Sequence, residues 1–476
     1  MCVKRLIAFA VIIISAATVL SQQNSIRNSV QSVSAHTALS QTTTDKASQV
    51  DTLMAHWSQG DAPGAAVIVI QDGKVVHEKG YGLADLKMKE RITPQTVFDI
   101  GSITKQFTAM AVMMLAERGK LSYADTLSKF FPEFQTEARQ ITVRQLLNHT
   151  SGIRDYSLVW GESKKLNGNE PRTNENAVKF LARQKQLRFL PGQKWEYSNS
   201  NYILLAQIVS KVSGEPFPQF VRKNIFQPLG MNDSYIYDQT QPTTGKHATG
   251  YVSQGSGFKP AERNSENYNY GDGQINSTIG DLAKWDQSLY TETLIKAATL
   301  KEAFAAGQLN DGTPVNYGLG WGLGCYRGLR FVSHGGGTDG FAAQITRFTQ
   351  QHFTVVVLSN YEQITLLSAV ANKIADIYLA DDLKSPAAVQ IAPERLNAYV
   401  GRYALYDVVM KISLEEGALW LSPPGQKKVK LVPASEEEFF VEGNLSAASF
   451  GFNKNAQGQI TCLILLDQNG TIFPRL

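Results

Sequence analysis

Apolar and polar residues show two different spacing patterns near the start of the chain. Between Val50 and Trp57, apolar residues stand at relative positions 0, 3, 4 and 7, which is the spacing of one face of an amphipathic helix. An apolar run then covers residues 65–70, and the pair Asp72-Gly73 separates it from a second run over residues 74–77. An Asp-Gly pair between two such runs is typical of a tight hairpin turn. The pattern therefore predicts a helix followed by a β-hairpin.

The middle of the chain is predicted to be largely helical. Apolar residues recur at helical spacing over residues 103–115, and Gly119 follows as a candidate C-cap. Strand-like runs return at residues 341–348 and 353–358, and a second helical stripe covers residues 364–377. Strands thus occur at both ends of this region with helices between them. This order predicts an α+β fold, in which one antiparallel sheet is flanked by helices and contains an inserted helical region.

The pattern changes again near the C-terminus. Residues 381–393 contain paired aspartates and two prolines, so we place a linker there between a first domain over residues 47–380 and a second over residues 394–476. The second domain shows short β-like runs separated by turn residues, at 408–413, 418–422, 428–432, 439–441, 460–466 and 471–473. Such spacing predicts an all-β domain, either a small antiparallel barrel or a sandwich.

The first residues are typical of a targeting segment. Lys4 and Arg5 precede an apolar stretch that ends near Leu20, and the small residue Ser21 follows. We expect residues 1–21 to be a secretory signal peptide and the Ser-, Thr- and Gln-rich residues 22–46 to form a disordered tether. The alternative is an uncleaved anchor, although the stretch is short for a membrane span. The protein is therefore expected to be exported, periplasmic or secreted, without a stable membrane span after cleavage.

Composition excludes several functional classes. The 476 residues carry a net charge of only +4, and no long basic run indicates nucleic-acid binding. Three cysteines exclude a disulfide scaffold, and seven scattered histidines without an HExxH motif give no support for a zincin-type metal site. Cys2 would leave with the signal peptide, and we expect Cys325 and Cys462 to be two free buried thiols.

The strongest candidate for chemistry is Ser102, followed three residues later by Lys105. It lies where a loop is predicted to end and the longest apolar helix to begin. The spacing puts both side chains on one helical face, where a desolvated amine can take the proton of a hydroxyl. An N-cap serine beside a solvated lysine is the alternative interpretation.

Two further polar motifs follow later in the chain. Tyr197-Ser198-Asn199 offers a phenol that can relay a proton and an amide that can hold a carbonyl, although an ordinary polar turn would look the same. His334-Gly335-Gly336-Gly337 precedes a predicted strand, and its glycines let the backbone approach a ligand closely. The alternatives are a flexible turn or the HGGG motif of lipases, but the chain lacks the G-x-S-x-G that such a fold requires.

Taken in this order, the three motifs resemble those of the serine β-lactamase and penicillin-binding superfamily. The similarity is greatest to class C β-lactamases, serine DD-peptidases and their esterase and D-aminopeptidase relatives. Segments in similar order include residues 80–82, 98–101, 146–152, 228–231, 281–285 and 317–321. The resemblance covers residues 47–380 and implies a β-lactamase/transpeptidase-like fold. The C-terminal stretch around residues 399–403 resembles the lipocalin-like barrel that follows some of these hydrolases.

The resemblance implies a role for each motif residue. Ser102 would be the acylated nucleophile, and Lys105 and Tyr197 would share the acid and base steps. Asn199 would bind a substrate amide together with the segment His334, Gly335 and Gly336, and the backbone N–H groups of Ser102 and Gly337 would hold the oxyanion. Neither a metal nor an organic cofactor is implied.

His334 departs from the lysine that many relatives carry. A lysine is a fixed positive charge suited to a substrate carboxylate, whereas a histidine is mostly neutral at pH 7. We therefore expect a serine hydrolase that acts through an acyl-serine intermediate on a small amide or ester, namely a D-amino-acid peptide, an ester or, weakly, a β-lactam. The partner would be a small-molecule or peptide substrate. The alternative is a catalytically weak penicillin-binding-like protein that binds peptidoglycan-type ligands. The oligomeric state is not predicted.

Overall fold

The computed structural model describes most of the chain after its N-terminal segment. The described residues are 45–58, 60–156, 172–184, 186–237, 246–262, 267–268, 270–384, 387–405, 408–442, 449–467 and 470–476. The predicted signal peptide and almost all of the predicted tether lie outside these residues. Helix α3 (Lys46–Met54) is the first described element. Among the described residues, no helix combines the length and the apolar composition that crossing a membrane requires.

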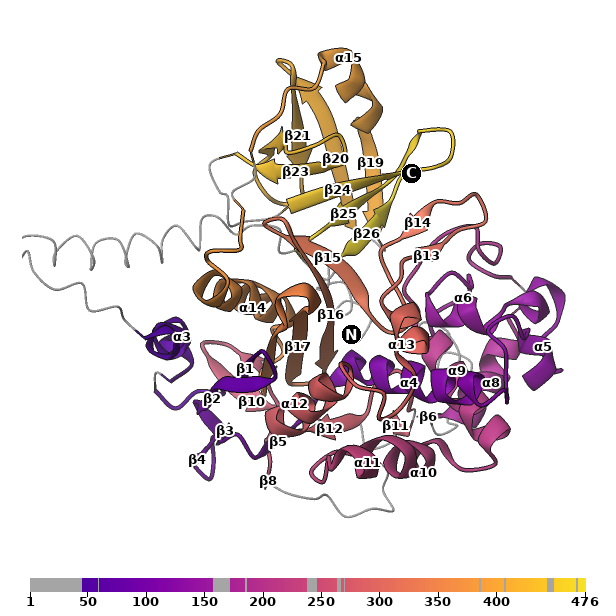
Figure 1. Ribbon diagram of the computed structural model, residues 1–476, viewed down its shortest axis with the longest axis vertical. Helices are drawn as coiled ribbons and strands as arrows, with labels where there is room; N and C mark the ends of the chain where they lie inside the picture. The colour runs from indigo at the N-terminus through magenta and orange to yellow at the C-terminus, as the bar shows by residue number, and fades with distance from the viewer. Residues whose placement is uncertain are drawn as a thin grey trace, which may run out of the picture.

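A six-stranded antiparallel sheet forms the centre of the first domain, as predicted. Its order is β15-β16-β17-β18-β1-β2, so strands from both ends of the domain meet inside it (Figure 1). The strands are β1 (Ala65–Gln71), β2 (Lys74–Tyr81), β15 (Gly322–Tyr326), β16 (Leu329–Thr338), β17 (Phe341–Phe348) and β18 (Phe353–Ser359). The predicted hairpin joins β1 to β2, and Asp72 and Gly73 both adopt the positive φ that a tight hairpin turn requires.

Strand β1 is buried on both faces because two hydrophobic cores pack against it. Ala65, Val67 and Val69 belong to a core shared with helices α3 and α14 (Ile364–Tyr378). The alternate residues Ala66, Ile68 and Ile70 belong to the core of the helical region. Side chains of a strand alternate between faces, so a strand covered on both sides reads as one continuous apolar run.

Helix α4 (Thr104–Glu117) lies within the helical region and is buried on every side over its first twelve residues. It ends where predicted, since Gly119 has a φ of +67° and its N–H donates to the carbonyl of Ala116. Helix α9 (Asn199–Ser213) packs beside it. The other helices of the region are α5 (Leu127–Phe130), α6 (Val143–Leu147), α8 (Asn174–Ala182), α10 (Phe217–Val221), α11 (Gln227–Leu229), α12 (Ile279–Ser288) and α13 (Ala297–Ala303).

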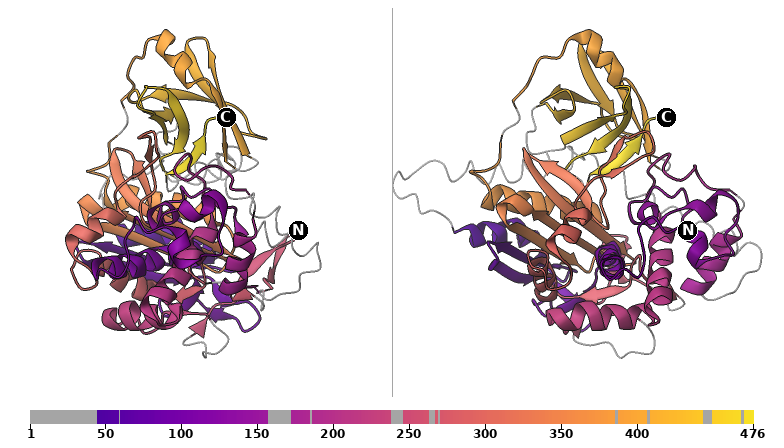
Figure 2. Two further views of the ribbon diagram at one scale, coloured as in Figure 1. Left: turned by 90° about the vertical axis from the view of Figure 1, so that its right-hand side faces the viewer. Right: turned by 45° about the vertical axis from the view of Figure 1, so that its right-hand side comes forward.

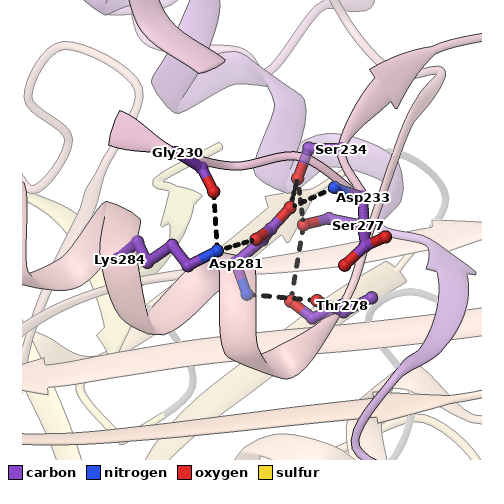
Figure 3. A network of polar contacts seen from close by, with 7 residues as sticks. All are labelled: Gly230, Asp233, Ser234, Ser277, Thr278, Asp281 and Lys284. Atoms are coloured by element: carbon purple, nitrogen blue, oxygen red, sulfur yellow. Dashed lines mark hydrogen bonds and ion pairs between the residues drawn. The ribbon is translucent and has the colours of Figure 1, made fainter. Parts of the chain in front are cut away.

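A polar network fixes the start of helix α12 (Figure 3). The buried carboxylate of Asp281 accepts hydrogen bonds from the Asp233 N–H, the Ser234 hydroxyl and the Lys284 ammonium, all at 2.7–2.9 Å. Further along this helix, the Trp285 indole donates to the Gln106 side chain on α4 and stacks on Phe107. The network therefore holds the start of α12 against residues 230–234, and Trp285 separately joins the helix to α4.

The C-terminal domain is an eight-stranded antiparallel barrel, so the barrel alternative of the prediction is confirmed. Its strands pair in chain order, and a bridge between Tyr403 and Arg475 joins the first strand to the last. The strands are β19 (Gly401–Leu405), β20 (Val408–Glu415), β21 (Ala418–Ser422), β22 (Val429–Pro433), β23 (Glu438–Val441), β24 (Ser449–Lys454), β25 (Ile460–Leu465) and β26 (Thr471–Pro474). Aromatic and aliphatic side chains fill the interior. The predicted runs did not include β19 and β24.

The barrel docks against β15, the edge strand of the six-stranded sheet, and stands at one end of the molecule in Figures 1 and 2. The Cys325 N–H donates to the carbonyl of Leu466 at 3.2 Å, and a Cβ on Gly470 would lie 2.1 Å from the carbonyl oxygen of Leu323. The barrel core also includes Trp195 and Tyr317 of the first domain. An edge strand that would otherwise expose unpaired backbone is thereby covered.

The two described cysteines are free, as predicted, but only one of them is fully buried. Cys462 lies in the barrel core, whereas Cys325 is half-buried on β15 where the two domains meet. Burial raises the pKa of each thiol to about 11, so both remain protonated at neutral pH.

Candidate active site

Ser102 lies in a tight turn between a strand and the buried helix α4. Strand β5 (Thr96–Asp99) ends at Asp99, whose carboxylate accepts the Gly101 N–H at 2.9 Å. Gly101 has a φ of +50°, a conformation that glycine adopts at little cost. From Gly101 to Leu115, Ser102 is the one residue that is not buried. The turn therefore presents a single accessible hydroxyl above an otherwise enclosed helix.

Lys105 is fully buried one helical turn after Ser102. Its Nζ lies 3.1 Å from the Ser102 Oγ, 2.8 Å from the Asn199 Oδ1 and 2.8 Å from the carbonyl oxygen of Asp272. A neutral amine has two N–H donors and one lone pair. It can therefore donate to the amide and the carbonyl while it accepts the serine proton. Burial lowers the pKa of Lys105 to about 8, and the carboxylates of Asp272 and Asp155 oppose this shift.

The Tyr197 motif enters the site at the start of helix α9. Ser198 is the N-cap, and Asn199 is the first helical residue, with its backbone N–H donating to the Asp155 carboxylate at 2.7 Å. The Tyr197 ring lies beside the lysine, with its centroid 4.9 Å from the Lys105 Nζ. A phenol and an amide thus face the same amine from neighbouring positions in the chain.

Asp272 adds a second buried ionisable group next to Lys105. Its carboxyl lies 3.4 Å from the Tyr156 hydroxyl, and its backbone carbonyl accepts from the lysine. Burial raises the pKa of Asp272 to about 6, although the neighbouring Lys105 ammonium opposes this shift. Above pH 6 the ionised carboxylate therefore favours the protonated form of Lys105.

His334 is buried on β16 and both of its ring nitrogens are engaged. Nδ1 lies 2.7 Å from the carbonyl oxygen of Gly335, which can only accept, so Nδ1 carries the proton. Nε2 is then an acceptor, and the Tyr317 hydroxyl donates to it at 2.9 Å. Burial and the nearby Lys105 charge lower the pKa of His334 to about 3. The imidazole is therefore neutral at pH 7.

Glycines allow β16 to touch the serine turn through the backbone. A Cβ on Gly336 would lie 1.9 Å from the carbonyl oxygen of Ile100 and 3.2 Å from the Ser102 nitrogen. A Cβ on Gly101 would lie 2.6 Å from the Gly337 nitrogen. The two backbone N–H groups predicted to bind an oxyanion, those of Ser102 and Gly337, therefore meet at one junction that side chains would block.

The structure brings all three predicted motifs to one place. Ser102, Lys105 and Asn199 share hydrogen bonds, Tyr197 lies against them, and the Gly335–Gly337 backbone runs beside the serine turn. The His334 ring lies 6.2 Å from the Tyr197 ring, centroid to centroid, and its nitrogens bond to other groups.

Sequence reasoning assigned no role to Asp272, His149 or Tyr317. The glycines on both sides of Asp272 are the one local signal that could have pointed to it. The other two residues lie in segments that the resemblance included. Within the described residues, no three His, Cys, Asp or Glu side chains are grouped as they would be to hold a metal ion.

Comparison with known proteins gives a consistent result. The family described as Beta-lactamase matches residues 47–377. Penicillin-binding protein 4* of Bacillus subtilis (strain 168) is 30% identical over 415 residues, which cover 82% of this chain and 90% of that protein.

Solved structures share the fold over most of the chain. The octameric penicillin-binding protein homologue from Pyrococcus abyssi superposes with a TM-score of 0.60 at 24% identity, covering 89% of this chain and 96% of that one. The D-amino acid amidase from Ochrobactrum anthropi SV3 also gives a TM-score of 0.60, at 22% identity over 71% of this chain and 100% of that one.

Proposed function

The chain belongs to the β-lactamase family of serine hydrolases, and from this premise we propose that it hydrolyses a small amide or ester through an acyl-enzyme at Ser102. The observation that carries the proposal is the position of the Lys105 amine. It is fully buried among three hydrogen-bonding partners, and the only hydroxyl among them is that of the one accessible residue in the turn. A base with these properties is suited to activating a serine nucleophile.

The proposed reaction has two stages. Neutral Lys105 takes the Ser102 proton while Oγ attacks the substrate carbonyl carbon, and the backbone N–H groups of Ser102 and Gly337 stabilise the resulting oxyanion. The tetrahedral intermediate collapses to an ester on Ser102. The leaving amine or alkoxide receives a proton from Lys105 and Tyr197, which share this transfer. Water then attacks the acyl-serine with the same groups as base, which releases a carboxylic acid and restores the serine.

The charges of the site favour a substrate without a free carboxylate, such as an amide or ester of a D-amino acid, over a β-lactam. His334 is neutral and uses both nitrogens for internal hydrogen bonds, so it offers no positive charge to a substrate carboxylate. Its position is where many relatives carry a lysine that supplies such a charge. The structural neighbours include a D-amino acid amidase and a D-stereospecific amidohydrolase, which supports this choice.

We further propose that the protein is exported, with residues 1–21 as its signal peptide and residues 22–46 as a tether. The basic start and the short apolar stretch of the sequence support this proposal. N-terminal sequencing of the protein recovered from outside the cytoplasm tests it, and a retained Met1 would refute cleavage.

A turnover panel on the purified protein tests the hydrolase proposal. The substrates are nitrocefin, p-nitrophenyl acetate, p-nitrophenyl butyrate and D-alanyl peptide p-nitroanilides, each assayed beside Ser102→Ala and Lys105→Arg. We expect turnover of the D-alanyl anilides to be lost in both variants, because the alanine removes the nucleophile and arginine cannot act as a base. Retained turnover in Ser102→Ala would refute the assignment of the nucleophile.

The relative named as a penicillin-binding protein supports one alternative, a protein that is acylated but turns over slowly. Labelling with a fluorescent penicillin distinguishes the two. Stable labelling of Ser102 without anilide turnover would favour the binding protein, whereas anilide turnover establishes the hydrolase.

A further inference from the structure

The loop that carries Tyr197 lies along a second segment, residues 148–152. Three backbone carbonyls of that segment accept N–H groups of the loop at 2.8–3.1 Å. The pairs are Gly152 with Arg188, Thr150 with Gly192, and His149 with Glu196. The loop is therefore held along its length before it reaches the catalytic motif.

His149 contacts the chain on both sides of Tyr197. Its carbonyl oxygen accepts the Glu196 N–H at 3.1 Å, and its ring Nδ1 accepts the Ser198 N–H at 3.2 Å. Between these two bonds, the His149 ring packs on the Tyr197 ring with 4.4 Å between the centroids. One residue thus fixes the residue before Tyr197, the residue after it and the phenol ring itself.

The hydrogen bonds to the His149 ring fix its tautomer, with Nδ1 as the acceptor. A second donor, the Asn201 side-chain amide, lies 3.0 Å from the same nitrogen, so the ring proton resides on Nε2. Complete burial, together with the nearby Lys105 and His334, holds the pKa of His149 well below its usual value. The other groups that face the ring are Tyr197, Tyr202, Tyr317 and Trp195, which are uncharged at neutral pH.

This arrangement has two costs for the fold. His149 has a φ of +61°, a left-handed conformation that is uncommon outside glycine, although histidine adopts it more often than most residues do. Its Nε2–H is buried and has no hydrogen-bond partner in the described part of the chain. Strained backbone of this kind persists where surrounding contacts hold it and is concentrated at functional sites.

We infer that His149 is a positioning residue of the active site, which holds Tyr197 against Lys105 by fixing the backbone on both sides of the tyrosine. The inference rests on the proposed function and adds a residue that acts through Tyr197 rather than on the substrate. Catalytic geometry is sensitive to displacements of about 1 Å, so loss of this support reduces turnover more than substrate binding.

Two substitutions separate the acceptor from the bulk of the side chain. His149→Asn tolerates the left-handed conformation and keeps an acceptor oxygen near the place of Nδ1, whereas His149→Leu keeps bulk and loses the acceptor. On the anilide substrate we expect kcat to fall roughly 100-fold in the leucine variant with KM changed less than about threefold, and most of kcat to return in the asparagine variant. His352→Leu is the matched control, since His352 also has a positive φ but is exposed on another turn.

A double-mutant comparison with Tyr197→Phe tests the route of the effect. If His149 acts through the tyrosine, His149→Leu has little further effect on kcat in the phenylalanine background. Equal losses in both backgrounds, or an unchanged kcat in His149→Leu alone, would overturn the inference.

Nitrogen NMR of the unmodified protein provides a readout that needs neither a folded variant nor turnover. With ¹⁵N-labelled histidine, we expect His149 to show a protonated Nε2 and an unprotonated Nδ1, without titration in the range around pH 6.5 where an ordinary histidine titrates. Titration in that range would refute the positioning role. If the substrate panel shows no turnover but this signature is present, the proposed function fails while the geometry around His149 stands.

Discussion

The buried amine of Lys105 makes the activity depend on pH in a way that can be calculated. With a pKa of about 8, only about one tenth of Lys105 is neutral at pH 7 and about nine tenths at pH 9. If the neutral amine is the base, kcat/KM rises about tenfold over this range with a midpoint near pH 8. At pH 7 an ordinary lysine would be neutral in only about one molecule in 3,000. The neutral fraction of Lys105 at this pH is therefore due mainly to its burial.

Asp272→Asn tests whether the carboxylate sets this midpoint. The substitution removes the negative charge that favours protonated Lys105 but leaves the backbone carbonyl that accepts from the amine. The midpoint is therefore expected to move to lower pH, and the variant is expected to be faster than the unmodified protein at pH 7. A fall of one pH unit would raise the neutral fraction at pH 7 from about one tenth to about one half, a gain of about fivefold.

The assay is kcat/KM for a p-nitroanilide substrate between pH 5.5 and 10, because the absorbance of p-nitroaniline does not change over this range. Asp376→Asn is the control. Asp376 pairs with Arg327 on the far side of the sheet from Lys105 and should leave the profile unchanged. A flat profile between pH 7 and 9 would refute a neutral-lysine base. A midpoint that rises in Asp272→Asn would refute the electrostatic role of that carboxylate.

Two further substitutions test backbone contact and buried charge. Gly336→Ala would place a methyl group 1.9 Å from the Ile100 carbonyl oxygen and displace the oxyanion donors, so kcat should fall by roughly 10²–10³. The control is Gly257→Ala, which lies in an open strand and should leave kcat unchanged. Asp286→Ala leaves the fully buried Arg347 without its partner and should lower the free energy of unfolding, measured in urea, by about 3–5 kcal/mol. A decrease below about 1 kcal/mol would contradict the importance of the pair.

Local signals in the sequence accounted for much of the fold. The Asp72-Gly73 turn and the apolar runs around it predicted the first hairpin, which the structure confirms. Strand β24, by contrast, reads Ser-Phe-Gly-Phe-Asn-Lys, and its glycine and asparagine weaken a strand pattern that barrel closure overrides. The prediction therefore succeeded where turn chemistry and apolar runs decide the structure. It missed a strand whose own pattern is weak and which forms by pairing with its neighbours β23 and β25.

The candidate site shows the same division. Ser102 and Lys105 could be paired from their spacing because one helical turn joins them. The partners that set the lysine pKa and the histidine tautomer come from distant parts of the chain, since Asp272 lies 167 residues from Lys105. Tyr317 of the first domain packs in the barrel core and donates to His334, a link between the barrel and the site that no local pattern indicates.

The place of β1 in the sheet also constrains when the protein can fold. This strand emerges early from the ribosome but lies between β2 and β18, and its second partner follows about 280 residues later. At typical rates of synthesis, roughly 15–60 s pass between the synthesis of β1 and that of β18. Such long-range pairing slows folding and leaves an aggregation-prone segment exposed. We therefore expect newly made chains to depend on a chaperone until residue 359 is available, and truncations before β18 to be insoluble.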